Sequence, residues 1–312
     1  MLEVLVYDAS DAARYAELIR APSGRVNVSV ASTPSEAAKH IATAEVLYAW
    51  KPPLHLYAEA RRLRWLHAMG AGVDWALVPE LPRRVVITRS PGVFGGWMAE
   101  YVLGWCLSVT QRMADYRRAQ VRREWIQHQP PERLAGKTIA IVGLGDIGRT
   151  VARAARVVGL RVIGVTRSGR PVPGVERVYR SRELRPALGA ADFVVLVVPL
   201  NDTTRGMIGA AELAAMRPTA WLINIGRGAL VDESALVQAL RRRTIAGAVL
   251  DVFTTEPLPP DHPLWTLDNA VITPHISGPN LPEEIAPVFN DNLARYLARR
   301  PLRHVVDRRR GY

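Results

Sequence analysis

Residues 138–148 read Thr-Ile-Ala-Ile-Val-Gly-Leu-Gly-Asp-Ile-Gly, an apolar run that passes directly into a Gly-x-Gly-x-x-Gly triplet. An amphipathic helical pattern follows, and this strand-loop-helix context is what makes the motif specific. Gly143 permits the tight turn, Gly145 lets the backbone approach a pyrophosphate, and Gly148 allows the helix to pack closely on the strand. The first amides of the helix then face the phosphates. The stretch predicts a dinucleotide site formed by Gly143, Leu144, Gly145, Asp146, Ile147 and Gly148.

Short apolar runs alternate with helical stretches on both sides of this motif. We expect strands at 2–7, 26–30, 46–49, 65–68 and 85–88, then at 138–142, 161–165, 193–198, 221–225, 247–250 and 270–272. One long helix is expected over 96–122 and a last one over 283–299. Such alternation predicts parallel strands joined by crossover helices. The predicted fold is α/β, with two doubly wound parallel-sheet domains, Rossmann-like and flavodoxin-like, and a cleft between them. Residues 1–98 plus 283–312 would form the substrate domain, and 99–282 the dinucleotide-binding domain.

Composition excludes several classes of protein. The chain has 312 residues, of which 48% are hydrophobic and 22% charged, so it is neither disordered nor collagen-like. No apolar run approaches the ~18 residues that a membrane span needs, and the first seven residues read as a strand rather than a signal peptide. A lone cysteine, Cys106, excludes an internal disulfide and a cysteine metal cluster. We therefore expect a cytoplasmic protein without a metal, with Cys106 in the core and His67 and the other scattered histidines in ordinary roles.

The charge balance is strongly basic. The formal net charge is +12, and only three of the 41 basic residues are lysines. A positive excess can indicate nucleic acid, an anionic membrane surface or small anionic ligands. The arginines are scattered in short groups without interleaved aromatic residues, which favours a solvated surface. We expect neither nucleic acid nor membrane as a partner, and nucleic-acid binding remains an alternative.

The segment after the next predicted strand bears on the choice of dinucleotide. It reads Thr166-Arg167-Ser168, where NAD-binding folds usually place an Asp or Glu that holds the ribose hydroxyls. Without a carboxylate nothing repels a 2′-phosphate, and a guanidinium group is well suited to bind one. The sequence therefore favours NADP(H) over NAD(H).

Three polar residues in the second domain follow predicted strands. Arg227, Glu256 and His275 come after the strands at 221–225, 247–250 and 270–272. Ligands of an open parallel sheet bind beyond the carboxyl ends of its strands, so these side chains can converge on the dinucleotide. Reduction of a 2-keto acid needs a cation for the carboxylate, polarisation of the ketone and a proton donor. An arginine and a histidine held protonated by a carboxylate supply that set.

Several segments together resemble the D-isomer-specific 2-hydroxyacid dehydrogenase family. They are Met69-Gly-Ala-Gly-Val-Asp74, Gly143–Gly148, Asn224-Ile-Gly-Arg-Gly-Ala-Leu-Val-Asp232, Leu250-Asp-Val-Phe-Thr-Thr-Glu-Pro-Leu258 and Thr273-Pro-His-Ile-Ser277. They appear in the family's order across nearly the whole chain. The ending Val305–Tyr312 and the segment Trp50–Pro53 resemble the glyoxylate/hydroxypyruvate reductase A branch.

The resemblance implies a role for each matching residue. His275 would be the acid/base with Glu256 as its partner, and Arg227 would bind the carboxylate and carbonyl of the substrate. The amides of Ala71, Gly72 and Val73 would hold the other side of that carboxylate. Further cofactor contacts would come from Pro199, Leu200, Ile225, Gly226, Asp251 and Ser277. The family is usually a homodimer joined through the nucleotide domain and an arm near Trp125–Pro131.

Loops of the first domain are expected to form the substrate pocket. Trp50, Lys51, Phe94 and Trp97 are expected in first-domain loops that roof the pocket, and their bulk favours small 2-keto acids such as glyoxylate and hydroxypyruvate. A dehydrogenase for larger or phosphorylated 2-hydroxy acids is an alternative, and so is a non-catalytic NADP(H)-sensing protein of the same fold.

Overall fold

The computed structural model describes all 312 residues and divides them into two compact units. Unit 1 comprises Met1–Val93 and Pro279–Tyr312, and unit 2 comprises Phe94–Gly278. Each contains one sheet in which every strand pair is parallel, so the α/β class with two parallel-sheet domains is confirmed. The unit boundaries fall after residues 93 and 278, where the sequence predicted 98 and 282.

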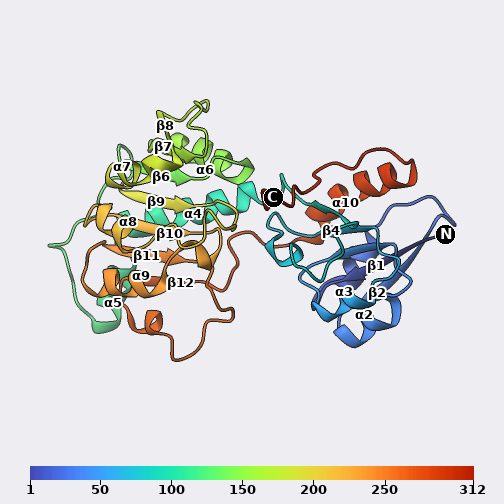
Figure 1. The fold of residues 1–312 in the computed structure, drawn as a ribbon. Coiled ribbons are helices and arrows are strands. Elements are labelled where there is room, and N and C mark those ends of the chain that lie inside the picture. The colour runs from blue at the N-terminus through green and yellow to red at the C-terminus, as the bar shows by residue number, and fades with distance from the viewer. The chain divides into compact units, whose positions relative to one another are not determined.

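Unit 1 carries a five-stranded sheet of order β2-β1-β3-β4-β5, of which Figure 1 labels β1, β2 and β4. Its elements are β1 (Leu2–Tyr7), α1 (Ala12–Glu17), β2 (Val26–Ala31), α2 (Pro34–His40), β3 (Val46–Ala49), α3 (His55–Glu59), β4 (Trp65–Ala68), the 3-10 turn η1 (Asp74–Ala76), β5 (Val86–Arg89) and α10 (Pro282–Leu297). All five expected strands form. α2 begins where a capping box predicts it, with the Thr33 hydroxyl accepting from the Glu36 amide at 3.3 Å.

Successive side chains of a strand point to opposite faces of the sheet, and in unit 1 both faces are buried. Leu5, Leu47 and Leu66 pack in an aliphatic core on one face. On the other face Phe289 of α10 stacks on Tyr48, with ring centroids 4.0 Å apart, and on Trp65. The C-terminal helix therefore completes the layer that covers β3 and β4.

Unit 2 carries a seven-stranded sheet of order β12-β11-β10-β9-β6-β7-β8, which Figure 1 shows from one edge to the other. Its strands are β6 (Thr138–Val142), β7 (Arg161–Thr166), β8 (Arg177–Arg180), β9 (Phe193–Leu196), β10 (Trp221–Asn224), β11 (Gly247–Leu250) and β12 (Ala270–Ile272). Its helices and 3-10 turns are α4 (Gly95–Thr110), α5 (Met113–Arg122), α6 (Asp146–Val157), η2 (Ser181–Glu183), α7 (Leu184–Gly189), α8 (Ala210–Ala215), η3 (Gly228–Leu230), α9 (Glu233–Arg241) and η4 (Pro263–Thr266). No helix of the chain is long and apolar enough to cross a membrane.

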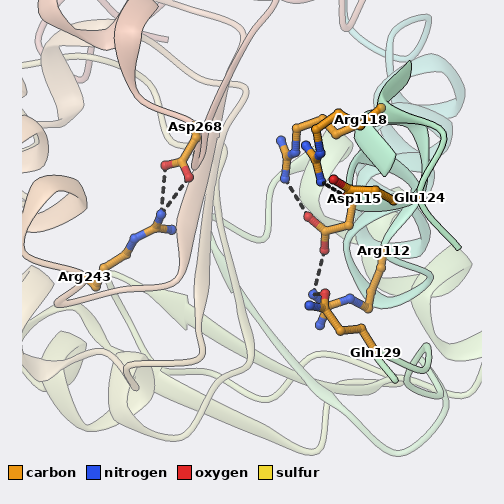
Figure 2. Close-up of polar contacts among 8 residues, drawn as sticks. Arg112, Asp115, Arg118, Glu124, Gln129, Arg243 and Asp268 are labelled. Carbon is orange, nitrogen blue, oxygen red and sulfur yellow. Dashed lines mark hydrogen bonds and ion pairs between the residues drawn. The ribbon is translucent and has the colours of Figure 1, made fainter. Parts of the chain in front are cut away.

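The expected single helix over 96–122 is wrong, because Arg112 adopts a left-handed conformation with φ of 53° and separates α4 from α5. Figure 2 shows what holds this residue. Its guanidinium group donates to Gln129 Oε1 at 2.6 Å and pairs with Asp115 at 2.8 Å. The pair with Asp115 is local, but the bond to Gln129, 17 residues further on, lies outside the range that a helical pattern reports.

The structure differs from the expected elements in two other places. Strand β8 was not expected, because its ends are charged and only Tyr179 is buried, as suits an edge strand. Phe94 and Trp97 were expected in first-domain loops, but they belong to unit 2, at the N-cap and in the first turn of α4. Two glycines open this helix against their low propensity. Gly95 is needed there, because a Cβ atom would lie 2.8 Å from Thr150 Oγ1 of α6.

Candidate functional site

The glycine loop after β6 is shaped to receive a phosphate. Gly143 has φ of 106° and turns the chain, and a Cβ on Gly148 would lie 1.9 Å from the Gly143 carbonyl oxygen. Gly145, by contrast, has no atom within 4 Å on the side where a Cβ would stand. This open side adjoins the N-terminus of α6, whose first amide groups have no intrahelical partners. A dinucleotide pyrophosphate fits this cradle.

The end of β7 forms a tight turn built by two hydroxyl groups. Thr166 Oγ1 accepts from the Gly169 amide at 3.0 Å, and Ser168 Oγ accepts from the Arg170 amide at 3.3 Å. The side chains of Arg167 and Arg170 are exposed at this turn. No aspartate or glutamate stands at the end of the strand, so the position suits an anionic group.

The unexpected strand β8 adds an arginine to the same turn. Arg180 pairs in register with Thr166, and a Cβ on Gly169 would lie 2.6 Å from Arg180 Cγ. Arg180 was not among the predicted site residues, because no strand was expected at 177–180. Its signal is the pattern Arg-Val-Tyr-Arg, in which a buried tyrosine lies between charged ends.

The carboxyl ends of β9 and β10 bring their loops together. A Cβ on Gly226 would lie 3.3 Å from the carbonyl oxygens of Leu196 and Val198, just before Pro199 and Leu200. Asn224 shapes the second loop, accepting from the Gly226 amide at 3.1 Å and donating to the Arg227 carbonyl at 2.9 Å. Ile225 and Gly226 are buried, while Arg227 is half-buried and its guanidinium donates to the Gly226 carbonyl at 2.8 Å.

Glu256 and His275 meet across the loops that follow β11 and β12. His275 Nδ1 lies 2.9 Å from Glu256 Oε2, and the other carboxylate oxygen accepts from the Phe253 amide at 3.0 Å. The loop of Arg227 packs directly on this region, since a Cβ on Gly228 would lie 1.9 Å from the Phe253 carbonyl carbon. The structure therefore gathers the loops of all three predicted residues in unit 2. Nε2 of His275 lies on the side of the ring away from Glu256.

The backbone of His275 is held in an unusual conformation by Asp251. His275 has φ of 55°, which side-chain-bearing residues seldom adopt. Its amide donates to the Asp251 carbonyl at 2.8 Å. The fully buried Asp251 carboxylate accepts from the amides of Ile276 and Ser277, each at 2.9 Å. Asp251, which was expected to contact the cofactor, thus binds the protein's own loop.

Tyr101 of α4 extends this network. Thr273 Oγ1 donates to Asp251 Oδ1 at 2.6 Å, so the Tyr101 hydroxyl, 2.6 Å from Thr273 Oγ1, is the donor in their bond. Burial raises the pKa of Tyr101 to about 12, which keeps this proton in place. The chain from Tyr101 through Thr273 to Asp251 connects a helix to the His275 loop. Tyr101 was not predicted as a site residue, because it lies more than 170 positions from Thr273 and no local pattern connects them.

The residues expected to bind the substrate carboxylate lie in unit 1, directly after β4. Ala71 and Gly72 are partly exposed and Val73 is buried. The Trp50 ring covers the start of this loop, since a Cβ on Gly70 would lie 2.2 Å from Trp50 Cζ3. Lys51 Nζ lies 5.3 Å from the centroid of that ring, within cation–π range.

The chain is similar to known proteins over most of its length. Residues 103–277 match the family model described as D-isomer specific 2-hydroxyacid dehydrogenase, NAD binding domain. Glyoxylate/hydroxypyruvate reductase A of Serratia proteamaculans is 33% identical over 276 residues, covering 86% of this chain and 88% of that protein.

Solved structures match over the whole length. A D-isomer specific 2-hydroxyacid dehydrogenase family protein from Aeromonas salmonicida is 36% identical with a TM-score of 0.91, covering 98% of this chain and 99% of its own. The NADPH-dependent glyoxylate/hydroxypyruvate reductase of Sinorhizobium meliloti, solved with NADP and sulfate, is 29% identical with a TM-score of 0.90, and both chains are covered completely.

Proposed function

Because the chain belongs to the D-isomer-specific 2-hydroxyacid dehydrogenase family, in the glyoxylate/hydroxypyruvate reductase A branch, we propose that it reduces small 2-keto acids with NADPH. Glyoxylate and hydroxypyruvate are the substrates we expect. The observation that carries this proposal is the Glu256–His275 pair, set beside the loop of Arg227 at the carboxyl ends of the strands that follow the glycine loop.

The cofactor would be held by residues that fit it. The open side of Gly145 and the first amides of α6 suit the pyrophosphate. Arg167, Arg170 and Arg180 surround the turn after β7 without a carboxylate at the strand end, which favours a 2′-phosphate. The NADP complex of the Sinorhizobium protein supports this choice. When bound, the cofactor supplies the hydride.

His275 would supply the proton. Its Nδ1 is bonded to Glu256, so Nε2 is the nitrogen that donates to the ketone oxygen as that oxygen gains negative charge. The Glu256 carboxylate fixes the orientation of the ring. Arg227 would bind the substrate carboxylate and offset charge on the carbonyl oxygen.

The loop after β4 in unit 1 is the second segment that we assign to the substrate. We assign the amides of Ala71, Gly72 and Val73 to the substrate carboxylate. Trp50 lies against the start of this loop with Lys51 beside it, and this bulky cover favours substrates with short side chains.

The test is to measure initial rates of NADPH and NADH oxidation side by side with glyoxylate, hydroxypyruvate and a bulkier 2-keto acid. Fast NADPH-dependent turnover of the two small acids is expected. Faster turnover with NADH would overturn the cofactor assignment and leave the chemistry in place. Tight cofactor binding without turnover of any acid would overturn the proposed enzymatic function in favour of an NADP(H) sensor.

We also propose a homodimer located in the cytoplasm. α5 and the segment after it present apolar side chains to solvent, with Val121 74% and Trp125 90% exposed. A second copy of the chain would cover them. The single buried cysteine suits a reducing compartment. Light scattering after size-exclusion chromatography measures the mass directly, and a monomer would contradict the proposed assembly.

A further inference from the structure

His67 is the only histidine of the chain that is buried, and its side chain is wholly enclosed. It lies in β4 among aromatic rings, with the centroids of Tyr48 and Phe289 each 5.4 Å away. Burial lowers its pKa to about 3, with a further contribution from the nearby His304. The ring is therefore neutral near pH 7 and has one donor and one acceptor nitrogen.

Hydrogen bonds around His67 determine which nitrogen carries the proton. The Ser90 hydroxyl donates to the Ala68 carbonyl at 3.2 Å, because a carbonyl oxygen can only accept. Ser90 Oγ must then accept from His67 Nε2–H, 3.0 Å away. The bare Nδ1 accepts from the Thr88 hydroxyl at 2.7 Å.

One more hydrogen bond completes this series. Thr88 Oγ1 accepts from Trp65 Nε1–H at 2.8 Å. These four hydrogen bonds therefore all point the same way, from Trp65 through Thr88, His67 and Ser90 to the Ala68 carbonyl. Each donor group makes one of the bonds. A charged ring would carry a second N–H facing Thr88, and the Thr88 hydroxyl could then no longer donate to the ring.

Ser90, the last side chain in this series of hydrogen bonds, also bonds the backbone at the start of the loop after β4. The Ser90 amide donates to the Gly70 carbonyl at 3.1 Å, while its hydroxyl bonds the Ala68 carbonyl. These two carbonyls lie on either side of Met69. Ser90 therefore fixes the path of the backbone immediately before residues 71–73.

We infer that His67 is a positioning residue for the keto-acid-binding loop, acting through Ser90 to set the backbone that precedes Ala71. The inference rests on the proposed function, because it takes the amides of residues 71–73 to bind the substrate carboxylate. Misplacing those amides weakens binding of the keto acid and leaves the glycine loop of unit 2 untouched.

The kinetic test compares single hydroxyl deletions with a stability control. Ser90→Ala and Thr88→Val are expected to raise the KM for glyoxylate by about five- to tenfold, as for a lost hydrogen bond, with the KM for NADPH within about twofold. Thr88→Ser restores the hydroxyl and should restore the KM. Leu66→Ala is the control, since Leu66 lies in the same strand but in the opposite core layer.

Thermal stability separates positioning from general damage. Leu66→Ala should lower the melting temperature at least as much as Ser90→Ala while changing the glyoxylate KM by less than about twofold. Equal increases of KM in Leu66→Ala and Ser90→Ala, at equal losses of stability, would overturn the inference. Unchanged KM in both Ser90→Ala and Thr88→Val would overturn it as well.

A spectroscopic measurement does not depend on turnover. Ring nitrogen NMR of the whole protein, with His67 assigned by comparison with His67→Gln, should show the neutral Nε2–H tautomer at pH 7. An Nδ1–H tautomer or a charged ring would overturn the inference whatever the kinetics. Failure of the wild type to reduce any 2-keto acid, with the Nε2–H tautomer present, would instead overturn the proposed function on which the loop's role rests.

Discussion

Glu256 receives the His275 imidazole on one carboxylate oxygen, at 2.9 Å from Nδ1, and the Phe253 amide on the other, at 3.0 Å. The carboxylate is therefore anchored by its own loop while it orients the ring of a residue that follows a neighbouring strand. Both side chains are about 29% exposed, so the pair lies at the surface of unit 2 and can be reached by a ligand.

Glu256→Gln should lower kcat by about 10- to 100-fold, because an amide holds the ring without stabilising its charged form. His275→Ala should lower kcat by at least about 100-fold and leave the affinity for NADPH within about twofold. In the His275→Ala background, Glu256→Gln should have little further effect, since the carboxylate acts through the ring. Steady-state kinetics and fluorescence titration with NADPH measure both quantities. Additive losses in the double variant would contradict the pairing.

Tyr101→Phe removes one hydroxyl and little volume, and we expect kcat to fall by about three- to tenfold as the His275 loop loses its outer support. Thr273→Val should cost more, because Asp251 then loses a donor directly. The two losses should not add in the double variant. Tyr116→Phe is the matched control, since that hydroxyl donates to the Gln129 carbonyl at 2.7 Å, on α5. An equal loss in Tyr116→Phe would refute a specific role for Tyr101.

Arg167→Ala should raise the KM for NADPH by about 10- to 100-fold and change the KM for NADH by less than about twofold, because a charge-assisted bond to the 2′-phosphate is lost. Arg177→Ala is the control, since it removes the same charge from the amino end of the neighbouring strand β8. Its guanidinium lies 4.3 Å from the Tyr179 ring centroid, and its loss should affect both cofactors little. Parallel changes for NADPH and NADH in Arg167→Ala would argue against phosphate recognition.

The stability of the protein should depend on pH through His67. Its pKa is lowered to about 3 in the folded chain, against about 6.5 when unfolded, so the folded state excludes a proton that the unfolded state binds. This contribution is fully present above about pH 6.5 and is lost as the pH falls toward about 3, at up to about 1.4 kcal/mol per pH unit.

Urea denaturation of the wild type and His67→Gln at about pH 7 and about pH 5 measures this effect, because the other titrating groups cancel in the difference. Relative to His67→Gln, the wild type should lose about 2 kcal/mol over that range. The same loss in both proteins would show that His67 does not titrate on unfolding.

The sequence alone determined the features that depend on short-range pattern. The strands at 46–49, 65–68, 138–142, 247–250 and 270–272 form with the expected bounds, because buried parallel strands are runs of apolar residues between turn signals. The glycine loop is equally local, since Gly143 and Gly148 are required by the turn they make. Arg227, Glu256 and His275 could be named as a group because parallel strands place their carboxyl ends on one edge of a sheet.

Only the tertiary structure decided features that depend on residues distant in the chain. Arg112, where the expected helix breaks, bonds Gln129, and a side chain at Gly95 would meet Thr150 of α6. Arg180 reaches the turn of Gly169 through the pairing of β8 with β7. The sequence around His67 indicates no special role. In the folded protein Thr88 of β5 and Ser90 directly after it lie beside His67, which becomes the centre of a series of hydrogen bonds. Such contacts have no local signature, because the free energy that favours them comes from groups that folding alone brings together.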